Sequence, residues 1–161
     1  MISRREILLS GGAGMALMLA GWPAMAAKGA YPVTHSEAEW RSLLEPAQFA
    51  VLREAATERP FTSPLLHEKR TGTFDCAGCG QAVFSSKTKF ESGTGWPSFW
   101  EPLADDVVAT GTDRSYGMVR TEALCSRCGG HLGHVFKDGP KPTGLRYCIN
   151  GLALAFTPAV G

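Results

Sequence analysis

The sequence predicts a mainly β fold of antiparallel sheets, preceded by two short helices. The chain has 161 residues, of which 44% are hydrophobic and 19% are charged, as expected for one soluble domain with a buried core. Its 19 glycines and 10 prolines indicate many turns. After Pro60, short apolar segments alternate with Gly, Pro, Ser and Asp, and their spacing favours antiparallel strands over βαβ units.

The first 26 residues, 1–26, are typical of a removable export signal. Arg4 and Arg5 precede a moderately apolar run, and Ala24-Met25-Ala26 suits signal-peptidase cleavage. The paired arginines favour the twin-arginine route, so we expect an exported, periplasmic protein whose single domain spans 27–161. A membrane anchor is the alternative. Glycines interrupt the apolar run, and it is shorter than the ~20 residues that a spanning helix needs, so we expect no stable membrane span.

Two short helices are expected next. Ser36 and Glu39 have the spacing of a capping box, which predicts a helix that begins after Ser36. Pro46 suits the first turn of a second helix, which we expect to end at 57–60. We interpret both helices as structural cover. The side chains expected to face inward are Trp40, Leu43, Leu44, Phe49, Val51 and Leu52.

The rest of the chain supplies the strands of one domain. The candidate strands are 73–76, 82–84, 117–124, 131–136, 145–150 and 152–156.

Four of the five cysteines form two CxxC units, each followed directly by glycine: Cys76, Cys79, Cys125 and Cys128. Two such turns make a tetrahedral four-cysteine site, which predicts one structural Zn²⁺ ion. Disulfides or a redox motif are the alternatives in an exported protein, but they leave the glycine after each unit unexplained. Residues 80–124 separate the units, a longer interval than in a compact zinc ribbon. The metal should therefore join distant parts of the chain.

The fifth cysteine, Cys148, is the candidate nucleophile. It lies two residues after Arg146 in an alternating segment, so both side chains should share one face of a strand. A neighbouring guanidinium favours the reactive thiolate. A buried and inert thiol is the alternative for an isolated cysteine.

The surroundings of Cys148 resemble a known family. The segments Gly93-Thr94-Gly95-Trp96-Pro97-Ser98-Phe99, His131-Leu132-Gly133-His134-Val135-Phe136, Asp138-Gly139-Pro140 and Arg146-Tyr147-Cys148-Ile149-Asn150 stand in the order and approximate spacing of peptide-methionine (R)-S-oxide reductases of the B type. The CxxC units match as well, and the resemblance extends from Trp40 to Phe156. It implies reduction of the R epimer of methionine sulfoxide, free or in proteins. It also implies two antiparallel sheets, amino-terminal helices and a zinc ion remote from the active site.

The resemblance also implies roles for individual residues. Cys148 attacks the sulfoxide, and His131 and His134 donate or relay the proton, with His134 favoured if only one acts directly. Both histidines reach one site only if their segment bends, which Gly133 allows. A zinc-ligand role for either histidine is the alternative, although four thiolates already complete the coordination shell.

Four further residues belong to the expected site. Trp96 bounds the pocket for the sulfoxide methyl group, although it could also be an ordinary core aromatic residue. Phe136 is assigned with it to substrate binding. Asp138 and Asn150 match family positions near the site, where we expect them to support the histidines and the strand respectively.

Thr94 departs from the family pattern, because many members carry a resolving cysteine at this position. With the other cysteines assigned to zinc, we expect a sulfenic acid on Cys148 that an external thiol donor, such as a thioredoxin-like protein, must reduce. Exported compartments are kept oxidising, so that reducing power must be delivered. We expect a monomer.

Two other functions are compatible with parts of the pattern. The first is an exported zinc-ribbon binding module for nucleic acid or protein, but the formal net charge of +1 provides no concentrated basic face, so we expect no nucleic-acid partner. The second is a cysteine-histidine acyl hydrolase that uses Cys148 and His134, but no nucleophile elbow surrounds the cysteine and no third orienting residue is evident.

Overall fold

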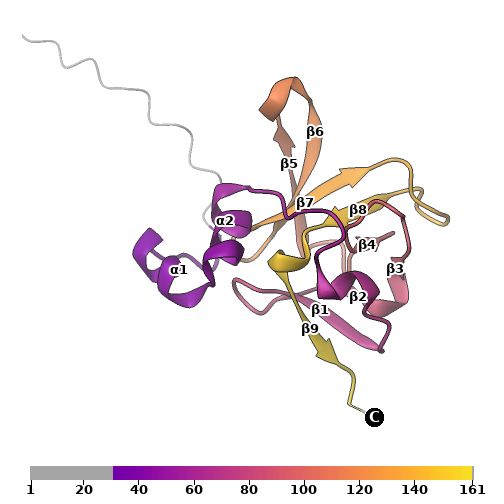
Figure 1. Ribbon diagram of the computed structural model, residues 1–161, viewed down its shortest axis with the longest axis horizontal. Coiled ribbons are helices and arrows are strands. Elements are labelled where there is room, and N and C mark those ends of the chain that lie inside the picture. Colours follow the sequence, from indigo (N-terminus) through magenta and orange to yellow (C-terminus); the bar gives the residue numbers. More distant parts are fainter. Residues whose placement is uncertain (1–30, 161) are drawn as a thin grey trace, which may run out of the picture.

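The computed structural model describes residues 31–160, which form two antiparallel sheets with two short helices beside them (Figure 1). This confirms the predicted mainly β fold. The proposed signal, 1–26, lies outside the described residues. Within 31–160, no helix has the length and apolar character needed to cross a membrane.

The helices are α1 (Glu37–Leu43) and α2 (Pro46–Glu54). The Ser36 hydroxyl accepts a hydrogen bond from the Glu39 amide at 3.3 Å, and the Ser36 amide donates to the Glu39 carboxylate at 2.7 Å, which confirms the capping box.

Two details of the helix prediction are wrong. Helix α2 ends at Glu54, before the predicted 57–60, because Ala55 adopts a left-handed conformation with φ 55° and so terminates the helix. Leu43, expected to face inward, is 60% exposed. It is the last residue of α1, and the apolar contacts of the helix are made instead by the buried Trp40 and by the capping residue Leu44.

The smaller sheet has three strands in the order β2 (Ala82–Ser85), β1 (Gly72–Cys76) and β9 (Leu154–Pro158). Strand β9 begins two residues later than the predicted strand 152–156. The reason is that Gly151–Ala153 forms a 3₁₀ turn, capped by Asn150, between β9 and the preceding strand.

The larger sheet has six strands. Their order is β3 (Lys89–Phe90), β4 (Ser98–Phe99), β8 (Arg146–Ile149), β7 (His131–Phe136), β6 (Arg120–Cys125) and β5 (Val108–Asp113).

Three strands of the larger sheet were not predicted. Strands β3 and β4 have only two residues each, and the polar, glycine-containing sequence of β5 lacks the usual apolar alternation. Strand β6 begins later than the predicted 117–124, because Ser115–Gly117 forms the turn of the β5–β6 hairpin. This hairpin projects from one end of the molecule (Figure 1).

Aromatic side chains join the two sheets. The rings of Phe84 in β2 and Phe99 in β4 stack at 4.4 Å, and Phe74 in β1 meets Phe99 edge to face at 5.0 Å. All three side chains are completely buried. Burial of each contributes roughly 2–3 kcal/mol, so this cluster holds β4, and with it the neighbouring β8, in a constant position.

Candidate active site and metal centre

The pairing of β7 with β8 brings the predicted site residues together. His134 is directly opposite Cys148, and Phe136 is directly opposite Arg146. Residues two apart on a strand share a face, so these four side chains lie on one face of the larger sheet.

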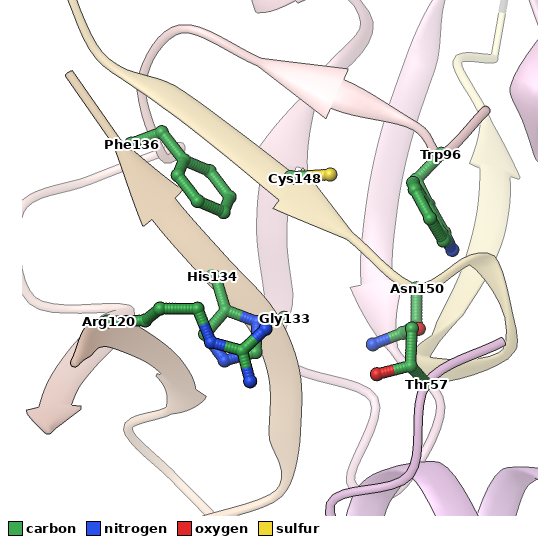
Figure 2. A pocket seen from close by; sticks show the side chains of 8 residues that line it. All are labelled: Thr57, Trp96, Arg120, Gly133, His134, Phe136, Cys148 and Asn150. Carbon is green, nitrogen blue, oxygen red and sulfur yellow. The ribbon is translucent and has the colours of Figure 1, made fainter. Parts of the chain in front are cut away.

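Cys148 opens into a pocket of about 110 Å³. In Figure 2, Cys148 lies between Phe136 and Trp96, with His134 nearby on the adjacent strand. Asn150 also lines the pocket, whereas His131, Arg146 and Asp138 do not. The lining residues are Thr57, Trp96, Arg120, Gly133, His134, Phe136, Cys148 and Asn150.

The Cys148 thiol is not held as a thiolate at rest. Burial raises the pKa of the thiol, and the Thr94 hydroxyl and the Arg146 guanidinium only partly oppose this effect. Arg146 donates hydrogen bonds of 2.9 and 2.8 Å to the Asp138 carboxylate, which offsets its charge, and stacks over the Phe136 ring at 4.5 Å. The guanidinium thus favours the thiolate, as expected, but burial outweighs it and the pKa of the thiol is raised overall.

His134 has an acidic partner that the sequence did not reveal. Its Nε2 lies 2.8 Å from Oδ2 of Asp113, and Nη2 of Arg120 lies 2.6 Å from the same oxygen. Hydrogen bonds from the Ser115 amide and hydroxyl, and then from His134, hold the pKa of the Asp113 carboxyl well below its usual range. Asp113 is thus an anion that orients His134 from the end of β5, a strand without a sequence signal.

His131 is buried behind His134. Its Nδ1 lies 2.8 Å from Oε1 of Glu122, and the rings of His131 and His134 meet edge to face at 5.3 Å. Burial lowers the pKa of His131 against the opposing effect of Glu122, so the imidazole is neutral at pH 7. His131 supports His134 and lies outside the pocket of Cys148. Glu122 was not identified from the sequence either.

The expected bend in β7 is present. The pairing of β6 with β7 shifts register between Ala123 and Leu124, which turns both histidines toward one side. A Cβ atom on Gly133 would lie 2.1 Å from the Cys148 carbonyl oxygen. Glycine is therefore required at this position because β7 and β8 approach so closely.

Asp138 and Asn150 act on different groups. Asp138 binds Arg146, so the expectation that it supports the histidines is corrected: their carboxylates come from Asp113 and Glu122. Asn150 accepts from the Glu58 amide at 2.9 Å and donates to the Leu132 carbonyl at 3.1 Å. It thereby supports the end of β8, as expected.

The Trp96 indole has a defined orientation. Its Nε1 donates to the Glu58 carbonyl at 2.9 Å. The preceding Gly95 has φ 91°, and a Cβ atom there would lie 2.8 Å from Pro60. The loop geometry and this hydrogen bond hold the ring at the edge of the Cys148 pocket.

The four CxxC cysteines gather into one cluster, away from the pocket. Their sulfur atoms all lie within 4.8 Å of one another, with 3.7 Å between Cys76 and Cys128 and 3.5 Å between Cys79 and Cys125. A tetrahedral site with metal–sulfur bonds of about 2.3 Å requires sulfur separations of about 3.8 Å, so the cluster fits one metal ion. Within 31–160, no histidine belongs to the cluster.

The cluster also joins the two sheets. Cys76 ends β1 of the smaller sheet, and Cys125 ends β6 of the larger one. This arrangement accounts for the long interval between the CxxC units.

The fold and site define a class of protein: a two-sheet β domain with a pocketed cysteine and a separate four-cysteine cluster. Residues 44–158 match the SelR domain. Three curated relatives are each called peptide methionine sulfoxide reductase MsrB. The relative from Bradyrhizobium diazoefficiens is 58% identical over 126 residues, which cover 78% of this chain and 91% of the relative. The relative from Methanosarcina mazei is 57% identical, covering 78% and 89%, and that from Leptospira interrogans is 56% identical, covering 78% and 96%. The chain belongs to this reductase family.

Proposed function

We propose that the protein reduces the R epimer of methionine sulfoxide, free or in proteins, with Cys148 as nucleophile. The observation that carries this proposal is the position of Cys148 directly opposite His134, in a pocket bounded by Trp96 and Phe136. The pocket volume of about 110 Å³ suits a methyl sulfoxide group rather than a whole residue. The two aromatic rings offer apolar contacts to the methyl group.

His134 moves the proton in the proposed reaction. Its Nε2 is hydrogen-bonded to the Asp113 carboxylate, so Nδ1 is the nitrogen that can exchange a proton with the reactants. Because the resting thiol is neutral, its proton must be removed before attack. His134 takes that proton and delivers it to the sulfoxide oxygen, and the imidazolium formed in between is stabilised by Asp113.

The proposed step is balanced. The Cys148 sulfur attacks, the oxygen passes from the substrate sulfur to Cys148, and the products are methionine and a Cys148 sulfenic acid. Thr94 occupies the position of a resolving cysteine, with its Oγ1 3.8 Å from the Cys148 sulfur. Two thiols of an external donor, such as a thioredoxin-like protein, then reduce the sulfenic acid and yield a disulfide and water.

The metal of the four-cysteine cluster is proposed to be zinc. Four thiolates in tetrahedral geometry are typical of structural Zn²⁺ sites, and such closed sites leave no position for a substrate. When bound, the ion would link the sheets and take no part in the reaction.

The domain is proposed to act in the periplasm, as a monomer, after removal of residues 1–26. Cell fractionation and amino-terminal sequencing test this. The expected mature protein is periplasmic and begins after Ala26, whereas a cytoplasmic chain that keeps Arg4 and Arg5 would contradict it.

Turnover of the two sulfoxide epimers tests the reaction. With dithiothreitol as donor, the wild type should consume methionine-R-sulfoxide and spare the S epimer, and Cys148→Ser should lose at least about 10³-fold in rate. Equal rates for both proteins would exclude Cys148 as nucleophile.

Intact mass after one turnover without a donor tests the recycling scheme. The wild type should gain one oxygen. Thr94→Cys should instead lose about 2 Da relative to its reduced form, because the new thiol can condense with the sulfenic acid. An internal disulfide in the wild type would overturn the scheme.

One observation supports the acyl-hydrolase alternative: Asp113 is a third residue, which orients His134 as the aspartate of a catalytic triad would. Family membership nevertheless favours the reductase. The zinc-ribbon alternative loses support, because its four cysteines join two sheets of a larger domain.

A further inference from the structure

A chain of three hydroxyl groups leads away from the Cys148 sulfur. Thr94 Oγ1 lies 3.8 Å from Sγ of Cys148, and 2.8 Å from Ser92 Oγ. Ser92 Oγ lies 2.7 Å from Ser98 Oγ, which is 3.1 Å from the Trp96 carbonyl oxygen. Ser98 is buried and pairs directly with Cys148 across β4 and β8. The chain thus begins and ends at residues of the candidate pocket.

The direction of this chain is determined while Cys148 is a thiol. The Trp96 carbonyl can only accept, so Ser98 donates to it. Ser92 must then donate to Ser98, and Thr94 to Ser92, because each hydroxyl has a single hydrogen. Thr94 Oγ1 is left as an acceptor, and the Cys148 thiol supplies its hydrogen. Every group in the chain is satisfied in this state.

The thiolate requires the opposite direction. A thiolate accepts hydrogen bonds only, so Thr94 must turn its hydrogen toward Cys148. Ser92 then donates to Thr94, and Ser98 donates to Ser92 instead of to the Trp96 carbonyl. The reversal needs only rotation of three hydroxyl groups, and it charges no group in the chain.

Resting on the proposed role of Cys148 as nucleophile, we propose that Thr94, Ser92 and Ser98 form a reversible hydroxyl chain. It accepts from the Cys148 thiol at rest and donates to the thiolate during attack. Thr94 contacts the reacting sulfur and is a catalytic residue in this scheme. Ser92 and Ser98 are positioning residues that act through Thr94. The hydroxyl of Thr94 therefore stands where many family members carry a resolving thiol, but it exchanges hydrogen bonds with Cys148 instead of forming a disulfide.

None of the charged groups around Cys148 belongs to the hydroxyl chain. Arg146 is on β8 with Cys148, and its partner Asp138 is in the connection between β7 and β8. His134 is on β7, and its partner Asp113 ends β5. Arg120 lines the same pocket. Substitutions in the hydroxyl chain leave all these charges in place. A change in the ionisation of Cys148 on such a substitution therefore reports the hydroxyls themselves.

Alkylation of Cys148 by iodoacetamide, followed by peptide mass analysis as a function of pH, measures the thiolate in the metal-loaded protein. Thr94→Val keeps the side-chain shape and removes the hydroxyl. It should move the alkylation midpoint to higher pH and lower the rate at pH 8 roughly tenfold, as expected for loss of one hydrogen bond to a charged group. Ser92→Ala should lower this rate roughly twofold through the weaker Thr94 donor. Thr94→Ser, which restores the hydroxyl, should behave as the wild type.

The double variant, Thr94→Val with Ser92→Ala, distinguishes a connected hydroxyl chain from two hydroxyls that act on Cys148 independently. Ser92→Ala should have no further effect when Thr94 is already valine, because Ser92 acts only through Thr94. Thermal melting identifies any variant that has lost its fold. An unchanged midpoint in folded Thr94→Val, no effect of Ser92→Ala, or additive effects in the double variant would each overturn the chain. Alkylation needs no sulfoxide, so this result is independent of whether the proposed reductase activity is found.

Discussion

Burial and charge act in opposite directions on the Cys148 sulfur. Burial raises the pKa of the thiol, whereas Thr94 and Arg146 favour the thiolate. The folded pKa lies above the ordinary value, so the thiol predominates at neutral pH and thiolate reactivity rises as the pH increases through the alkaline range. A proton acceptor such as His134 is then needed for attack at pH 7.

Removal of the nearby positive charge should suppress the thiolate further. We expect Arg146→Gln to slow alkylation of Cys148 at pH 8 at least about threefold, because the guanidinium is lost and Asp138 remains as an uncompensated negative charge. Lys69→Gln is a matched control, since Lys69 is exposed and pairs with Glu91. Equal alkylation rates for Arg146→Gln and the control would show that the guanidinium has no electrostatic role.

Asp113 should matter through the orientation of His134. We expect Asp113→Asn to lower kcat about 10²-fold with little change in KM, because an amide does not stabilise the imidazolium and can present an N–H group to Nε2. Asp106→Asn, an exposed change in the loop before β5, is the control. Steady-state kinetics with a methionine-R-sulfoxide peptide measure the effect. A rise in KM with an unchanged kcat would assign Asp113 to substrate binding instead.

At the scale of the strands, the pairing of β7 with its two neighbours, β6 and β8, brings the residues of the candidate site together. The register shift in the β6–β7 pair turns His131 and His134 to one side, and the β7–β8 register places His134 opposite Cys148. The close approach at Gly133 makes both possible.

A side chain at Gly133 should separate these strands. We expect Gly133→Ala to lower the free energy of unfolding by about 3 kcal/mol and to abolish activity, because its Cβ would lie 2.1 Å from the Cys148 carbonyl oxygen. Gly111→Ala in β5 is the matched control, since its Cβ would approach no backbone atom closely: the nearest atoms are Oε2 of Glu122 at 3.1 Å and Cδ1 of Leu124 at 3.5 Å, both at the ends of side chains. Urea unfolding of both variants provides the measurement. Equal stabilities would contradict the strand geometry.

Within residues 31–160, an aromatic contact and a cysteine cluster both join the two sheets. The first is made by Phe74, Phe84 and Phe99, and the second by the four CxxC cysteines. The candidate active site lies on the larger sheet, but Asn150 leads from β8 toward β9 of the smaller sheet. Loss of either contact should therefore disturb the site indirectly.

Metal removal should unfold the domain rather than remove a catalytic group. We expect one zinc ion per chain, and a fall in Tm of at least about 10 °C after chelation or in Cys125→Ser, because metal binding is coupled to folding and 1 kcal/mol corresponds to roughly 3–5 °C in a domain of this size. Cys148→Ser, the control, should keep the metal and the Tm of the wild type. Full activity and an unchanged Tm without metal would refute a structural role.

Local patterns were sufficient for much of this molecule. The capping box predicted the start of α1, the CxxC spacing predicted that four cysteines form one cluster, and the residues around Cys148 identified the family. These signals are short-range, because caps, paired ligands and strand alternation each depend on residues a few positions apart. The position of Arg146 near Cys148 follows from the same alternation.

Long-range pairing decided the rest. Asp113 is 21 residues from His134 in the chain, and it reaches the histidine only through two strand pairings, one of them with the unpredicted β5. The sequence by itself determined the fold class, the family and the four cysteines that form the cluster. Only the tertiary structure decided which carboxylate pairs with which basic side chain, and that burial outweighs the nearby positive charge in setting the pKa of Cys148. The reason is that desolvation and ion pairing depend on every group around an atom, and most of those groups come from distant parts of the chain.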